Sequence, residues 1–252
     1  MCVHKMNKRP SSLSGLDRRM KKQLKSFLKS QWNEWRGTIL FVIFVVIPVK
    51  SSLADWNWVP TGSMNPTIVE GDLVYVDKLA YDIRVPLTLH SLKALADPER
   101  GDISVLFSPE DSMRLVKRVI GVPGDEIEMR NNALYINGTR LDYGELPAEE
   151  TQDLMTELRN RSLFAEEDLG GVKHAVMGTP NVRTEKRSFD GIVVPDGHYF
   201  VMGDNRDMSK DSRYFGFVER KLFIGEATNV IASFNMLDRY QPRISRFFTS
   251  LK

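Results

Sequence analysis

One strongly apolar run, residues 38–49, constrains this chain more than any other feature. Its twelve residues are fewer than the ~20 that usually cross a bilayer as a helix. All four tryptophans flank the run, with Trp35 before it and Trp56 after it. A helix from Trp35 to Trp56 would be ~31 Å long and would place indole rings at both bilayer interfaces. We therefore expect a membrane anchor over residues 36–55.

Charge is divided unevenly between the two sides of this run. Residues 1–54 hold eleven Lys/Arg against Asp17 and Glu34, so their charge is about +9. Because the whole chain has a formal net charge of +2, the remaining residues carry about −7. A basic segment before an apolar run is typical of the cytoplasmic side of a membrane helix. Nucleic-acid binding by this segment is the alternative, but we expect no nucleic acid partner. We expect residues 1–35 to lie in the cytoplasm. We expect residues 56–252, here called the body, to lie on the other side of the membrane.

A cleaved secretory signal is another interpretation of the apolar run. The segment Ser52-Leu53-Ala54 is similar to a cleavage site of small residues. The basic region before the run is, however, far longer than that of ordinary signal peptides. This length favours an uncleaved anchor.

The body has short apolar runs separated by Gly, Pro, Asp and Asn, a pattern typical of strands and turns. The expected strands cover residues 73–76, 103–107, 115–120, 134–136, 192–194, 199–202 and 229–234. We expect a mainly β fold, an antiparallel β-sheet body. Cys2 is the single cysteine, so no intrachain disulfide is possible and the body must fold by its core alone.

An acidic segment interrupts this pattern. Residues 145–170 contain eight acids against Arg159 and Arg161, and Pro147 is a candidate first residue of a helix. The segment is predicted to be a solvated insertion with one short helix and no part in chemistry. We expect a variable acidic insertion over about residues 139–190.

Ser63 lies fourteen residues beyond the apolar run and is a candidate nucleophile. A serine hydroxyl needs a neighbouring base to take its proton. Histidine is a weak candidate for that base. His4 lies in the basic segment of residues 1–35, and His90, His174 and His198 show no sequence pattern of a catalytic partner. The Gly-x-Ser-x-Gly elbow is also missing around Ser63.

Lysine is the other candidate base. Along an extended strand alternate side chains share a face, so Lys117 is predicted to lie with Met113, Leu115 and Val119, and Arg118 points away. Apolar neighbours lower the pKa of a lysine from its ordinary value near 10.4, as a lysine base requires. An ordinary strand lysine that reaches solvent is the alternative.

Three segments, residues 60–67, 117–125 and 203–213, closely resemble in order the motifs of bacterial type I signal peptidases. Smaller elements at residues 78–86 and 101–103 fit the same pattern. The resemblance covers nearly the whole body, and five ordered motifs are hard to obtain by chance. Met208 departs from the family, which usually has Asn at this position.

The resemblance implies a membrane-bound serine protease that cuts exported preproteins after a small-x-small sequence. Ser63 would be the nucleophile and Lys117 the general base of a Ser/Lys dyad. The oxyanion site would use the backbone amide of Ser63 and the hydroxyl of Thr61. Ser209 would bond the lysine amine and fix its direction.

Other matched positions have supporting roles in the family. The charged residues that would support the site without doing chemistry are Arg118, Asp204, Asp211 and Arg213. The residues that would line the shallow substrate pockets are Val59, Met64, Leu115 and Val116. These roles are implied by the resemblance alone.

We expect no metal and no cofactor. Asp207-x-Ser209-x-Asp211 begins like a calcium loop, but Ser212 stands where the loop glycine belongs and Val218 where a bidentate Glu is expected. Cys/His spacing for zinc is likewise missing.

The expected partners are signal peptides of secretory preproteins and the lipid bilayer, at the bacterial cytoplasmic membrane, with the catalytic body on the outer (periplasmic) side. A peptidase dedicated to one pilin or conjugation-type substrate is an alternative with the same dyad. A second alternative is a non-catalytic, membrane-tethered binding module in which Ser63 is only a turn residue.

Overall fold

The computed structural model describes residues 20, 23, 25, 31–32, 34–47, 52–85, 88, 90–236 and 238–251. These residues belong to two compact units, Met1–Val49 and Lys50–Lys252. In the first unit, residues 34–41 are helical and lead into the π-helix η1, Val42–Val46. No helix within the described ranges is both long enough and apolar enough to cross a membrane. The predictions for Cys2 and His4 lie outside the described residues.

The expectation of one helix from Trp35 to Trp56 is wrong. Trp56 lies in strand β1, Ala54–Trp58, which pairs antiparallel with β2. Asp55 is buried in this strand and pairs with Lys78 at 3.2 Å. Backbone pairing and this ion pair hold residues 54–58 in the sheet and prevent their addition to a helix.

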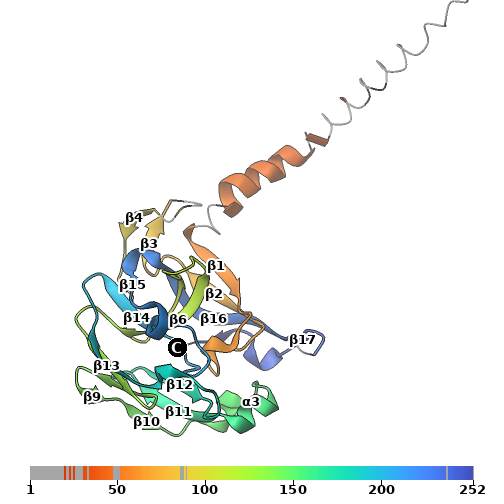
Figure 1. Ribbon diagram of the computed structural model, residues 1–252. Coiled ribbons are helices and arrows are strands. Elements are labelled where there is room, and N and C mark those ends of the chain that lie inside the picture. Colours follow the sequence, from red (N-terminus) through yellow and green to blue (C-terminus); the bar gives the residue numbers. More distant parts are fainter. Residues whose placement is uncertain are drawn as a thin grey trace, which may run out of the picture. The chain divides into compact units, whose positions relative to one another are not determined.

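The largest sheet has nine strands in the order β1-β2-β16-β5-β6-β14-β15, with β17 and β18 also paired to β16 (Figure 1). Its strands after β1 are β2 (Asp72–Asp77), β5 (Ile103–Phe107), β6 (Arg114–Gly121), β14 (His198–Met202), β15 (Val218–Glu219), β16 (Phe223–Asn235), β17 (Gln241–Pro242) and β18 (Thr249–Ser250). Each neighbouring pair in this sheet is antiparallel. The expected fold class, mainly β and antiparallel, is confirmed for the body.

Three smaller sheets complete the body (Figure 1). A four-stranded sheet has the order β13-β7-β8-β9, with bounds Phe189–Val193, Glu126–Arg130, Ala133–Ile136 and Thr139–Arg140. A three-stranded sheet joins β10 (Asp142–Gly144), β11 (Leu163–Asp168) and β12 (Lys173–Gly178). A two-stranded sheet joins β3 (Asp82–Arg84) and β4 (Ser91–Ala94).

Short helices connect these strands. The α-helices of the body are α3 (Thr156–Arg161) and α4 (Ser212–Phe215). The 3-10 helices are η2 (Gly62–Met64), η3 (Ala148–Thr151), η4 (Glu185–Arg187), η5 (Arg220–Leu222) and η6 (Ile244–Arg246). None of these is long, so the sheets carry the fold.

The core forms where strands alternate between buried and partly exposed side chains. In β2 this alternation is complete, and Val74 and Val76 are fully buried. They pack in one cluster with Val105 of β5 and Val230 of β16. Burial of each such side chain contributes about 1.5–3 kcal/mol relative to leaving it exposed.

All seven strands expected from the sequence lie within or overlap observed strands. The acidic insertion differs from its prediction. Pro147 is the N-cap of η3, and α3 follows, but the insertion also contains the sheet β10-β11-β12. Glu167 and His174 are buried in that sheet. The insertion is therefore a folded part of the body, because its polar side chains find buried partners.

Candidate active site

Lys117 and Ser63 meet in the body. Lys117 Nζ donates to Ser63 Oγ at 2.8 Å and to the carbonyl oxygen of Val116 at 3.0 Å. Strand β6 carries the lysine, and the 3-10 turn η2 carries the serine. The structure thus brings together the two residues that were predicted to form the dyad.

Lys117 lies in a setting that favours its neutral form. Only 3% of the residue is exposed. Burial lowers the pKa of Lys117, Asp211 and Asp204 raise it, and Arg213 lowers it, so that the net pKa is about 8 instead of the ordinary 10.5. A pKa near neutrality gives an amine that accepts a proton at physiological pH.

Lys117 lies where both faces of β6 are buried, since residues 117–121 are all buried. Leu115 and Val119 belong to one apolar cluster, as predicted for the face they share with Lys117, and Val116 packs against another. Met113 departs from the prediction, since it precedes β6 and is 60% exposed. The strand pairs with β5 on one side and β14 on the other, so its centre is closed to solvent.

The turn around Ser63 is tightly confined. Thr61 is an exposed, extended N-cap residue of η2, and its side chain makes no capping hydrogen bond. A Cβ at Gly62 would lie 2.3 Å from a carboxylate oxygen of Glu70, so a larger residue here would have to displace the Glu70 side chain. Met64 is fully buried and anchors the turn in the core.

Asn205 holds this turn from the opposite side. Its backbone N–H donates to the carbonyl oxygen of Ser63 at 3.1 Å, and its Nδ2 donates to that of Gly62 at 3.0 Å. The sequence reasoning assigned no role to Asn205, although it stands within the third motif. A buried side-chain amide beside a sharp turn is the signal that could have found it.

Gly203 allows the loop to approach the serine. A Cβ at this position would lie 2.3 Å from the Ser63 carbonyl oxygen and 2.3 Å from Ser209 Oγ. The Gly203 N–H donates to the Asp211 carboxylate at 3.0 Å. Residues 203–211, here called the catalytic loop, therefore contact the backbone of Ser63 directly.

Two buried ion pairs flank the dyad. Arg118 donates Nε and NH2 to the two oxygens of Asp204 at 2.9 and 2.8 Å, and Arg213 makes the same bidentate contact with Asp211 at 2.8 Å for both bonds. Burial would raise the pKa of Asp204, but Arg118 opposes it and the pKa lies below its ordinary value. Both pairs are present as the resemblance implied.

The profile of the family described as "Signal peptidase, peptidase S26" matches residues 32–232. The chain belongs to this family. The signal peptidase I of Pseudomonas fluorescens is 37% identical over 189 residues, which cover 72% of this chain and 62% of that protein. The signal peptidase I of Rickettsia massiliae is 30% identical over 257 residues, which cover 88% of this chain and 94% of that one.

The matched region thus spans about three-fifths of the length of the Pseudomonas relative. Among solved structures, the crystal structure of a signal peptidase I from Enterococcus faecalis V583 is 34% identical. It covers 53% of this chain and 99% of its own, with a TM-score of 0.34.

Ser209, which the signal peptidase family would use to orient the lysine, lies beside the site but does not bond Lys117. Its Oγ is buried and has no hydrogen-bond partner among the described residues. The Oγ lies close to Gly203 at the nucleophile's turn. The orienting role of Ser209 stays a prediction.

The substrate-pocket residues implied by the signal peptidase resemblance differ in exposure. Val59 is 4% exposed and Met64 is fully buried, and both pack in the core. Leu115 and Val116 are half-buried. Their role in substrate selection stays a prediction.

Among the residues that the structure describes, the Ser63 hydroxyl bonds Lys117 and no histidine. His90 is exposed, and His198 bonds the backbone oxygen of Asp196. His174 Nε2 lies 3.4 Å from a Glu167 oxygen and 3.9 Å from an Asp204 oxygen, and neither ring nitrogen has a hydrogen-bond partner among the described residues. These carboxylates come from separate strands and loops, so no local spacing announces them.

The acidic positions of the catalytic loop are occupied by protein partners. Asp207 accepts from Arg187, from Asn132 and from the N–H of Thr179. No group of three or more His, Cys, Asp or Glu residues in the described ranges is placed to hold a metal ion.

Proposed function

We propose that this protein is a serine endopeptidase that removes N-terminal signal peptides from exported preproteins by a Ser63/Lys117 dyad. The observation that carries the proposal is the 2.8 Å contact between a buried lysine amine and a serine hydroxyl. Family membership supports the same activity. The cleavage site would follow a small-x-small sequence, with Val59, Met64, Leu115 and Val116 near the small side chains.

In the proposed mechanism the neutral amine of Lys117 accepts the proton of Ser63 Oγ as that oxygen attacks the scissile carbonyl carbon. The carbonyl oxygen gains negative charge and is stabilised by the Ser63 N–H and the Thr61 hydroxyl. Thr61 supports this role because its side chain is exposed and makes no capping bond.

The Lys117 ammonium then gives its proton to the leaving amine, and the C–N bond breaks to leave an acyl-serine. In the second half, Lys117 takes a proton from a water molecule that attacks the ester carbonyl. The ester C–O bond breaks, Ser63 Oγ regains a proton, and a free carboxylate is released. The original serine proton thus leaves on the amine product, a proton of water replaces it on Ser63, the second proton of water passes to solvent as the acid ionises, and Lys117 is again a neutral amine.

We propose that the N-terminal helix anchors this body to the bacterial cytoplasmic membrane, with the catalytic body on the outer side. Leu40, Phe41 and Phe44 of that helix are 52%, 58% and 72% exposed. In the body, Trp58 is 40% exposed and Phe248 is 78% exposed. Exposed apolar surface of this kind favours a lipid environment.

Incubation of the purified chain with a preprotein in detergent, with mass spectrometry of the products, tests the activity. Wild type is expected to cut at one site after a small residue, and Ser63→Ala and Lys117→Ala are expected to be inactive. Near-normal cleavage by either variant contradicts the dyad. Membrane fractionation tests the anchor, because release by a high-salt wash would contradict it.

A further inference from the structure

Glu167 and Arg206 form a buried ion pair that joins the acidic insertion to the catalytic loop. Arg206 donates NH1 and NH2 to the two carboxylate oxygens of Glu167 at 3.0 and 2.5 Å. Glu167 is fully buried and Arg206 is 3% exposed. Burial would raise the pKa of Glu167, but Arg206 beside it holds that pKa well below its ordinary value. The pair is thus charged and bidentate, the geometry that restricts two groups most.

Backbone contacts continue this connection to the nucleophile. Met177 lies in β12 of the insertion. Its backbone N–H donates to the carbonyl oxygen of Asp204 at 2.9 Å, and its carbonyl oxygen accepts from the backbone N–H of Arg206 at 2.8 Å. Asn205 lies between these two bonded residues and donates to Ser63 and Gly62. The insertion therefore holds both sides of the residue that fixes the turn of Ser63.

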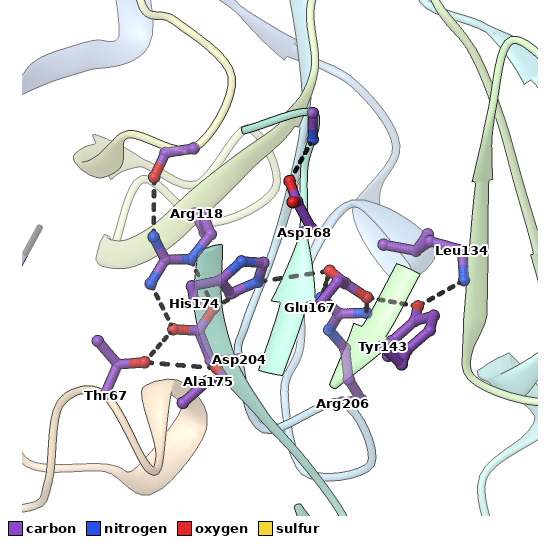
Figure 2. A network of polar contacts seen from close by, with 12 residues as sticks. Thr67, Arg118, Leu134, Tyr143, Glu167, Asp168, His174, Ala175, Asp204 and Arg206 are labelled. Carbon is purple, nitrogen blue, oxygen red and sulfur yellow. Dashed lines mark hydrogen bonds and ion pairs between the residues drawn. The ribbon is translucent and has the colours of Figure 1, made fainter. Parts of the chain in front are cut away.

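A second route runs through the side chains that Figure 2 shows. His174 lies between Glu167 and Asp204, with its Nε2 at 3.4 and 3.9 Å from their oxygens. Asp204 is bonded to Arg118, the neighbour of Lys117 in β6. On the other side of Glu167, Tyr143 donates its hydroxyl to the carboxylate. The network therefore reaches the strand of the base as well as the turn of the nucleophile.

We infer that Glu167 and Arg206 are positioning residues of the reaction, which hold the catalytic loop so that Asn205 fixes the turn of Ser63. The inference rests on the proposed peptidase function and makes the insertion a working part of the site. Neither side chain bonds Ser63 or Lys117 in the described structure. Their loss is expected to lower kcat rather than raise KM, because a misplacement of ~1 Å costs about 100-fold in rate.

The test is the double variant Glu167→Leu/Arg206→Met in the full chain, in detergent, with a signal-peptide substrate. Replacing both charges by apolar side chains avoids a single buried charge, so the fold is expected to survive. We expect a fall in kcat of at least about tenfold, with KM within about twofold of wild type. Circular dichroism and thermal unfolding confirm that the compared samples are folded.

Arg220→Met is the matched control. Arg220 also pairs with buried Asp82 and bonds Asp97, but none of its hydrogen bonds in the described structure reaches the catalytic loop. This control is expected to lose thermal stability and keep kcat. A merely structural role for Glu167 and Arg206 predicts the same behaviour for the double variant.

A folded double variant with wild-type kcat overturns the inference. A loss of activity that equals the fraction of unfolded protein in the sample also overturns it. If the double variant does not fold, Arg206→Lys takes its place, since a lysine keeps the charge but not the bidentate contact. Its kcat is then expected to fall, and a wild-type value overturns the inference. An inactive wild type would instead contradict the proposed function, so the two failures are distinguishable.

Discussion

Lys117 Nζ and Ser63 Oγ lie 2.8 Å apart, although 54 positions separate the two residues in the chain. The contact depends on three elements that meet at one place: strand β6, the turn η2 and the catalytic loop. The lysine has no solvent to stabilise its ammonium, and the serine has a base within bonding distance. Each prediction below changes one part of this arrangement.

The pH profile of cleavage should follow the ionisation of Lys117. Its pKa is lowered to about 8 by burial, and only the neutral amine accepts the serine proton. Activity should therefore rise with pH through about 8 and fall about tenfold per pH unit below it. Initial rates of peptide cleavage between pH 5 and pH 10 measure this. A flat profile from pH 6 to pH 8 would contradict a lysine base.

Lys117→Met should abolish cleavage and yet stabilise the fold at pH 7. Burial lowers the pKa of Lys117 from 10.5 to about 8, so the charged form is destabilised in the folded state. This cost is full below pH 8, is about 3 kcal/mol, and disappears as pH rises from 8 to 10.5. Urea unfolding at pH 7 and at pH 9.5 should show a gain in the variant that shrinks at the higher pH. A variant less stable than wild type at pH 7 would refute the assignment.

Thr61→Val should lower kcat about 10²–10³-fold if the hydroxyl is an oxyanion donor. The melting temperature should hardly change, because Thr61 is exposed and its side chain makes no capping bond. Thr61→Ser, which keeps the hydroxyl, serves as the matched variant and should retain most activity. Equal kcat in the Val and Ser variants would argue against this donor.

Gly203→Ala should remove most activity. Its Cβ would lie 2.3 Å from the Ser63 carbonyl oxygen, so the catalytic loop must move away from the nucleophile. A shift of ~1 Å costs about 100-fold in rate. Gly178→Ala is the control, since its Cβ would meet Asp207 at an ordinary 3.4 Å. Cleavage rates of the two variants, compared after thermal unfolding scans, decide the matter, and equal rates would exclude crowding at Gly203.

His174→Gln should flatten the acid side of the stability curve. Burial, and then Arg118, lower the pKa of His174, whereas Glu167 and Asp204 raise it, and the net pKa lies below 6.5. The unfolded state therefore binds a proton first, and stability falls as pH drops below 6.5, by up to about 1.4 kcal/mol per pH unit. Glutamine lacks this titration. Identical pH dependence of urea unfolding in both proteins between pH 5 and pH 7.5 would contradict this.

The strands could be predicted because their signals are local. The apolar run that follows Gly101-Asp102 places residues 103–107 in a strand, and β5 has these same bounds. Alternation along one strand also predicts that Lys117 shares a face with Leu115 and Val119, but residues 117–121 are all buried, so alternation alone does not explain the burial of Lys117. The turn of Ser63 was recognisable because its motif is continuous.

The remaining features depend on contacts between distant segments. Trp56 follows the apolar run closely in the sequence, as an interfacial residue would, but pairing with β2 places it in a strand. His174 shows no partner pattern in the sequence, but it meets Glu167 across the pairing of β11 with β12 and Asp204 from the catalytic loop. No periodicity within one segment encodes such meetings.

By itself, then, the sequence determined the mainly β class, because strand periods are local. Its short motifs also predicted, by resemblance, a Ser63/Lys117 dyad and the charged residues that would support it. Only the tertiary structure decided that the acidic insertion reaches the catalytic loop and that Asn205 grips the turn of Ser63. Buried polar groups must find partners wherever the fold brings them. The partners of Glu167 and Asn205 lie on other elements, so packing, rather than sequence neighbourhood, selects them.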